Sequence, residues 1–181
     1  MKNKRFRIYF SLFVLLAALA LIAREHFNGG VVSHHLLHRA DMPAISNWWS
    51  ILVLPVLTWF LVGRTQKRIA AESHRIFSSA KLPASVVLGF LAALIYGIAL
   101  SVSFSTGYVT ITGYIFQGMF LLAVLFPIYR AECLLGFVLG MTVTFGAVIP
   151  IIVGSIIAAL SALVHLGLRP ALGRLVAWFK R

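Results

Sequence analysis

The sequence has few charged residues and very few acids. Charged residues make up only 11% of the 181 residues, and 4 residues are Asp or Glu, whereas soluble domains carry about 25% charged residues. Hydrophobic residues make up 61%, and the mean hydropathy is +0.98. These values exclude an ordinary soluble domain and a disordered chain. They predict an all-α fold, a polytopic transmembrane helix bundle.

Cysteine and the common catalytic motifs are also scarce. Cys133 is the single cysteine, which excludes an internal disulfide, a CxxC redox pair and a cysteine-based metal cluster. The sequence contains no GxSxG, HExxH, Walker or dinucleotide-binding motif. No acid lies in the middle of an apolar run, which argues against ion transport through a buried carboxylate. Glu132 is the nearest candidate, and we expect it to form a salt bridge with Arg130.

Long apolar runs divide the chain into about six expected spans. They cover residues 1–23, 47–63, 85–105, 109–129, 133–149 and 150–168. The last two come from one uncharged run, 133–168, which as a single helix would be about 54 Å long against a hydrocarbon core of about 30 Å. We therefore expect a break at Phe145-Gly146-Ala147 and Pro150, with a short or re-entrant hairpin as the alternative. The first run also fits a signal peptide, but its length favours an uncleaved span.

The segments between the spans carry most of the basic residues. Residues 24–46 form a histidine-rich loop, 64–84 a basic linker and 169–181 a basic amphipathic tail. We expect the linker and the tail to be helices that lie at the membrane surface. With six spans and a cytoplasmic N-terminus, fourteen of the 16 Lys and Arg lie on the cytoplasmic side, whereas five spans place only ten there.

This charge distribution predicts cytoplasmic N- and C-termini and an outer histidine-rich loop. We expect a bacterial inner (plasma) membrane protein that contacts anionic lipid headgroups. The net charge of +12 follows from this topology, because the basic residues flank apolar runs and form no separate polar domain. Nucleic acid is therefore not an expected partner.

The outer loop is the most unusual segment because it holds four of the six histidines and two of the four acids. We expect a short helix over Val31–Arg39, which would project His34 and His38 from one side. Together with His26 they would suit a divalent metal such as Zn, Cu, Fe or Ni. The alternative is a structural role, in which the imidazoles sit at the headgroup interface and cap helix ends.

Hydroxyl side chains gather near the same outer ends of the third and fourth spans. They belong to Ser101, Ser103, Ser105, Thr110 and Thr112. They form either a neutral polar vestibule or hydrogen bonds between helices, typically worth about 0.6 kcal/mol each. Together with the loop they supply the candidate substrate-binding or gating residues, which are Glu25, His34, His35, His38, Arg39, Asp41, Ser101 and Thr112.

Small residues recur at helical spacing in the last two spans. Gly136 and Gly140 form a GxxxG motif, and Gly154 and Ala158 form a similar pair. Such residues let helix backbones approach closely. We expect them to pack the fifth span against the sixth, or to form a face for a second copy or a membrane partner.

These features favour a membrane protein that binds or passes a small solute or lipid, with the histidine-rich loop as an outer gate or binding lip. One alternative is a metal-dependent membrane enzyme that uses His34, His38 and an acid on a lipid or quinone-like substrate. The other is a scaffold subunit that packs into a larger complex through the last two spans.

Overall fold

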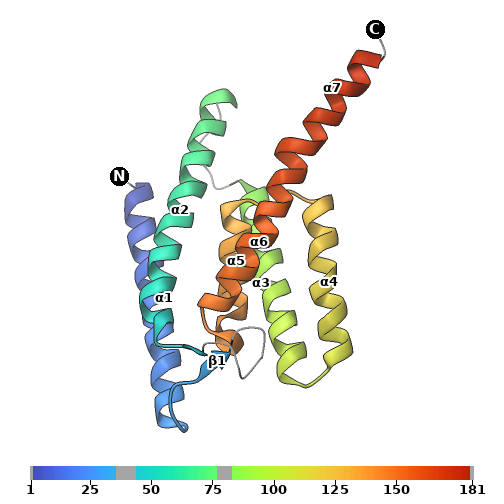
Figure 1. Ribbon diagram of the computed structural model, residues 1–181. Helices are drawn as coiled ribbons and strands as arrows, with labels where there is room; N and C mark the ends of the chain where they lie inside the picture. The colour runs from blue at the N-terminus through green and yellow to red at the C-terminus, as the bar shows by residue number, and fades with distance from the viewer. Residues whose placement is uncertain (1, 36–43, 77–82, 180–181) are drawn as a thin grey trace.

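The computed structural model describes residues 2–35, 44–76 and 83–179. In chain order the elements are α1 (Lys2–Phe27), β1 (Ser33–His35), β2 (Ala44–Ser46), α2 (Trp49–Ile76), α3 (Ala84–Ser105), α4 (Val109–Leu125), α5 (Ala131–Phe145), α6 (Val148–Ala162), a π-helix (Leu163–Leu168) and α7 (Arg169–Phe179). The helices α1 to α6 pack side by side in one bundle (Figure 1). The prediction of an all-α bundle is confirmed at the level of fold class.

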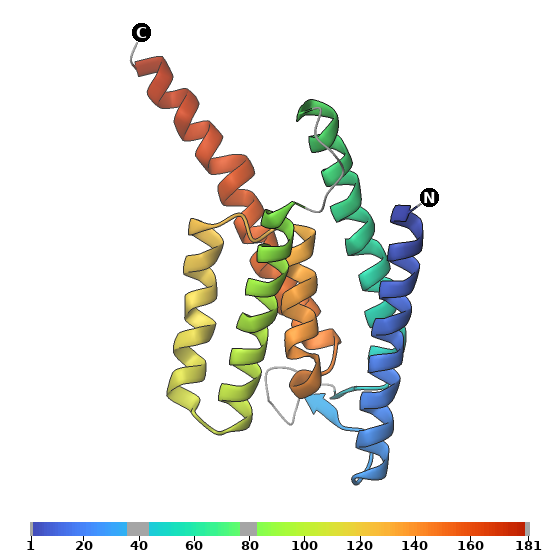
Figure 2. The same cartoon turned by 180° about the vertical axis from the view of Figure 1, so that it is seen from behind.

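Within the part of the chain that the structure describes, three helices are long and apolar enough to cross a membrane, judged by length and composition. They cover Lys4–Phe27, Ala84–Ser105 and Val148–Leu175, while α4 and α5 are apolar but shorter. Both chain ends lie at one end of the bundle, which we call the terminal end, and the strand pair lies at the opposite end, the strand end (Figures 1 and 2).

Helix α5 is the centre of the bundle. Its 15 residues are flanked by α2, α3 and α6, and eight of them are buried. A straight helix of this length measures about 22 Å, which is less than the thickness of a hydrocarbon core. Because protein surrounds α5, its ends find polar partners on neighbouring elements.

The backbones of α3 and α5 approach each other more closely than residues with a Cβ atom would allow at the contact. A Cβ atom on Gly97 would lie 2.6 Å from the Phe137 carbonyl oxygen, and one on Gly136 or Gly140 would overlap the carbonyl oxygens of Phe90 or Leu94. The GxxxG motif therefore packs α5 against α3, not against the sixth span or a second copy as expected. Gly154 of α6 does face α5, since a Cβ there would lie 2.7 Å from Leu134 Cδ1.

A glycine turn separates α5 from α6 at the expected break. Gly146 has φ +65° and its N–H donates to the Thr142 carbonyl, which ends α5. Only glycine adopts this conformation readily. The next amide, that of Ala147, donates to the Ser50 hydroxyl over 3.0 Å and so joins the turn to the start of α2. Pro150 follows in the first turn of α6, where a missing N–H has little effect.

Two segments that we expected to be separate surface helices continue the bundle helices instead. Helix α2 runs without interruption from Trp49 to Ile76 because no glycine or proline follows Gly63 in that range. Helix α7 continues α6 through the π-helix and projects from the terminal end (Figures 1 and 2). Pro170 would clash with the carbonyl four residues earlier in a regular α-helix, and the π-helix directly before it relieves this conflict.

The expected helix over Val31–Arg39 is wrong for its described part. Gly29 and Gly30 both have positive φ and reverse the chain after α1. Ser33–His35 then forms β1, which pairs antiparallel with β2 in the register His34 to Ile45. The extended backbone that follows the turn suits the β-branched pair Val31-Val32 better than a helix does.

Candidate functional site

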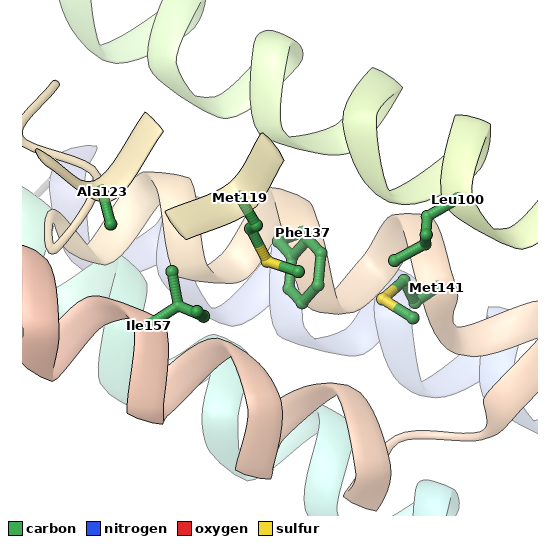
Figure 3. Close-up of a cluster of buried hydrophobic side chains, with 6 residues drawn as sticks. All are labelled: Leu100, Met119, Ala123, Phe137, Met141 and Ile157. Carbon is green, nitrogen blue, oxygen red and sulfur yellow. The ribbon is translucent and has the colours of Figure 1, made fainter. Parts of the chain in front are cut away.

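An apolar cavity of about 430 Å³ lies between α3, α4, α5 and α6. This volume lies within the usual range of small-ligand sites, about 300–1,000 Å³. Met119 of α4, Phe137 of α5 and Ile157 of α6 line its inner part. These three side chains lie close together in the buried cluster shown in Figure 3.

Small residues leave the space that forms this cavity. They come from α3 and α6 and are Gly89, Ala92, Ala93, Gly154 and Ala158. The fourth wall is α4, which buries only Met119 and Ala123. Tyr96 crosses from α3 toward α4 and donates a hydrogen bond from its hydroxyl to the Ile115 carbonyl. The cavity therefore has a closely packed side along α5 and a more open side along α4.

The polar end of the cavity lies at the terminal end of the bundle, where α4 joins α5. Among the described residues, Arg130 and Glu132 are the charged side chains that line this end, and Ser85 and Cys133 line it as well. Glu132 lies in the first turn of α5, where a negative charge complements the helix dipole. The cavity thus has an apolar interior and one charged end, lined by Arg130 and Glu132, which we call the mouth.

The Glu132 carboxylate is buried, with 4% exposure, and its ion pair is with Arg68 of α2, not with Arg130 as expected. The distance from Arg68 Nη2 to Glu132 Oε1 is 2.7 Å. Thr65 Oγ1 lies 3.5 Å from Glu132 Oε2, and Arg68 Nε lies 3.5 Å from Glu72 Oε1. The continuation of α2 past Gly63 brings Arg68 to this position, so the helix extension neutralises the buried acid.

The end of α4 beside the mouth is fastened to α6 and α7. Arg169 Nη2 donates to the carbonyl oxygens of Val124, at 2.7 Å, and Leu125, at 3.3 Å. Ser161 Oγ donates to the Phe126 carbonyl over 3.1 Å. The bonds from Arg169 satisfy two carbonyls in the last turn of α4, where a helix end leaves carbonyls without partners. They fix the wall and the α4–α5 connection that borders the mouth.

At the strand end, Glu25 organises a separate polar junction. Its Oε1 accepts a hydrogen bond from Asn47 Nδ2 over 2.8 Å, and its Oε2 accepts one from the Val32 amide over 3.1 Å. Asn47 is buried and its side chain packs against Gly146, where a Cβ would overlap Asn47 Oδ1. Glu25 therefore joins α1, the strand pair, α2 and the α5–α6 turn.

The structure places part of the predicted histidine site. His26 is exposed near the end of α1, and the backbones of His34 and His35 lie in β1. His38, Arg39 and Asp41 lie outside the described residues. Among the described residues no group of three or more His, Cys, Asp or Glu is arranged to hold a metal. The metal and gating roles of this loop stay predictions. Because His34 lies in the strand β1, the argument that a helix projects His34 and His38 from one side no longer applies.

The predicted cluster of hydroxyl side chains forms hydrogen bonds between helices and to the backbone. Ser101 donates to the Gly140 carbonyl over 3.3 Å, and Ser103 Oγ lies 2.8 Å from Thr112 Oγ1. Ser105 Oγ lies 3.3 Å from Thr144 Oγ1. These contacts tie α3 to α4 and to α5, as the packing alternative requires. Ser101 and Thr112 lie far along the chain from the Glu25 junction, and the described contacts do not link them to it.

Sequence reasoning missed both the cavity and the Arg68–Glu132 pair. The cavity walls are Gly, Ala and large apolar residues, which look the same in sequence as ordinary span residues. Neither a protein-family model nor a curated protein nor a solved structure matches this chain significantly. The site is therefore interpreted from its own geometry.

Proposed function

We propose that this chain is an integral membrane protein of six crossings that binds the apolar part of a lipid-like molecule in the cavity between α3, α4, α5 and α6. The cavity itself is the observation that supports this function. Its interior offers Met119, Phe137 and Ile157, and its described charged groups, Arg130 and Glu132, lie at one end. A molecule with an apolar tail and a polar head matches that order of surfaces.

The position of the cavity favours lipid binding over a gate at the histidine-rich loop. Residues of the α4–α5 connection, at the terminal end, line the cavity, while the strands lie at the other end of the bundle (Figure 1). The wall formed by α4 has little buried surface, which suits exchange of a ligand with the surrounding lipid. The proposed ligand thus enters from the bilayer, and none of the described residues of the loop lines the cavity.

The test uses hexadecanol with a photoreactive diazirine in its chain, added to the protein reconstituted in vesicles. After irradiation, peptide mapping should find the label on cavity residues such as Met119 and Phe137. Ala158→Phe places a ring in the cavity and should reduce this labelling by about tenfold, which corresponds to 1.4 kcal/mol.

Ala159→Phe is the matched control because Ala159 is exposed and does not line the cavity. It should leave labelling of Met119 and Phe137 unchanged. Label confined to outward residues, or equal labelling in both variants, would contradict the proposed function.

A further inference from the structure

The mouth of the cavity has a charge preference that its apolar interior does not reveal. Among the described residues, two charged side chains line the cavity, Arg130 and Glu132. The carboxylate of Glu132 is already bound by Arg68 Nη2 at 2.7 Å and is almost completely removed from solvent. A buried carboxylate that holds a guanidinium at this distance is neutralised locally.

Among the described lining residues, the guanidinium of Arg130 therefore supplies the net charge of the mouth. Arg130 directly precedes α5 as its N-cap residue, and α5 begins one residue later. The positive end of the α5 dipole adds to the charge of Arg130 on the same side of the mouth. Glu132 would oppose a bound anion if it were unpaired, but Arg68 removes that repulsion.

This inference rests on the proposed function. We infer that the ligand of this cavity is a single-tailed amphiphile with an anionic head group, a carboxylate or phosphate. Arg130 binds the head group at the mouth, and the tail fills the space beside Phe137. A volume of about 430 Å³ suits one tail and not two. A guanidinium binds either anion through paired N–H donors. Neutral and cationic heads of the same tail length should bind less well.

The experiment compares photoreactive palmitic acid with the corresponding hexadecanol on the full chain reconstituted in vesicles of uncharged lipid. The acid should label Met119 and Phe137 at about tenfold lower concentration than the alcohol, because charge-assisted hydrogen bonds are worth about 1.4 kcal/mol or more. Arg130→Gln should remove this difference by weakening binding of the acid alone. Lysophosphatidate should compete with the acid, and inorganic phosphate alone should not.

The control is Arg174→Gln, since Arg174 is exposed on α7 and does not line the cavity. It should preserve the preference for the acid, which separates a contact at the mouth from the general basic charge of this end. Equal labelling by acid and alcohol, or an unchanged preference in Arg130→Gln, would overturn the charge inference and leave the proposed function intact. Failure of both probes to label the cavity would instead overturn the proposed function. Competition by inorganic phosphate alone would overturn the inference that the tail is needed for binding at the mouth.

Discussion

Glu132 is an unusual residue for an apolar helix because its carboxylate is buried at 4% exposure. Its partner Arg68 keeps partial access to solvent, with a side-chain exposure of 26%, and has a second carboxylate in Glu72. The two members of the pair are therefore not equivalent. Without Glu132, Arg68 can turn to water and Glu72, but without Arg68 the carboxylate stays buried and unneutralised.

This asymmetry predicts different costs for the two single substitutions. Arg68→Gln should lower the free energy of unfolding by about 3 kcal/mol, the cost of leaving a buried charge alone. Glu132→Gln should cost only about 1 kcal/mol, the value of an ordinary hydrogen bond. The double variant should be more stable than Arg68→Gln. Unfolding in mixed micelles, followed by tryptophan fluorescence, measures these differences.

Arg64→Gln is the control for that series because Arg64 is an exposed residue of the same helix. It should change stability by less than about 0.5 kcal/mol. Equal costs for Arg68→Gln and Glu132→Gln, or simple additivity in the double variant, would contradict the proposed asymmetry.

Gly146 allows a second comparison at the level of one residue. It combines φ +65° with close contact to Asn47 Oδ1, whereas Gly107 has φ +77° and nothing within 4 Å of the position that a Cβ atom would take. Gly107→Ala should cost about 1 kcal/mol for the left-handed conformation alone. Gly146→Ala should cost about 1–3 kcal/mol more, because φ +65° with ψ −167° is essentially restricted to glycine and because the buried Asn47 must move. Thermal unfolding of both variants gives the difference, and similar costs would show that the Asn47 contact yields easily.

At the scale of elements, the packing of α3 on α5 depends on glycines from both helices. Gly136→Ala should destabilise the bundle by about 2–3 kcal/mol, although alanine is the better helix former, because its methyl group overlaps the Phe90 carbonyl. Gly113→Ala on α4 should instead stabilise by about 1 kcal/mol, since open space surrounds that position. Chemical unfolding in detergent measures both, and a neutral Gly136→Ala would show that α3 and α5 separate at little cost.

The sequence indicates which elements form better than it indicates how they pair. Apolar length and turn residues predict a helix over 85–105, and α3 covers Ala84–Ser105. They also predict the break at Gly146, since one straight helix would exceed the bilayer. The GxxxG motif marks a smooth face on α5, but α3 and α6 are equally apolar neighbours, so the motif alone does not select the partner.

Polar pairing was harder to predict for a related reason. Arg130 is two residues from Glu132 and is the obvious partner in sequence, whereas Arg68 is 64 positions away. Only the continuation of α2 past Gly63 brings Arg68 to the carboxylate. The cavity has no polar signature in sequence, because it arises from Gly and Ala on separate helices. Its position depends on the separation between α4 and α5, which is determined by how the helices pack.

At the scale of the whole molecule, the charge distribution and the arrangement of elements both distinguish the two ends of the bundle. The terminal end has the start of α1, the end of α2, Arg130 and α7, and the basic side chains that the structure describes there include Arg7, Arg64, Arg68 and Arg169. The strand end has the Glu25 junction and a single described arginine, Arg24. From this distribution the positive-inside rule predicts that the terminal end faces the cytoplasm. The cavity mouth would then face the cytoplasmic leaflet, where anionic lipids offer the head groups that Arg130 would bind.

Single cysteines test this orientation cleanly, because Cys133→Ser removes the only native thiol. In that background, Asn28→Cys lies in the turn after α1 at the strand end, and Arg174→Cys lies on α7 at the terminal end. A membrane-impermeant maleimide should label Asn28→Cys on intact cells that express the chain, and Arg174→Cys only after the membrane is permeabilised. Detergent should expose both cysteines equally, which controls for expression. The six-crossing topology places an odd number of crossings between the two positions, so labelling of both from the same side would contradict it, and with it the cytoplasmic mouth of the cavity.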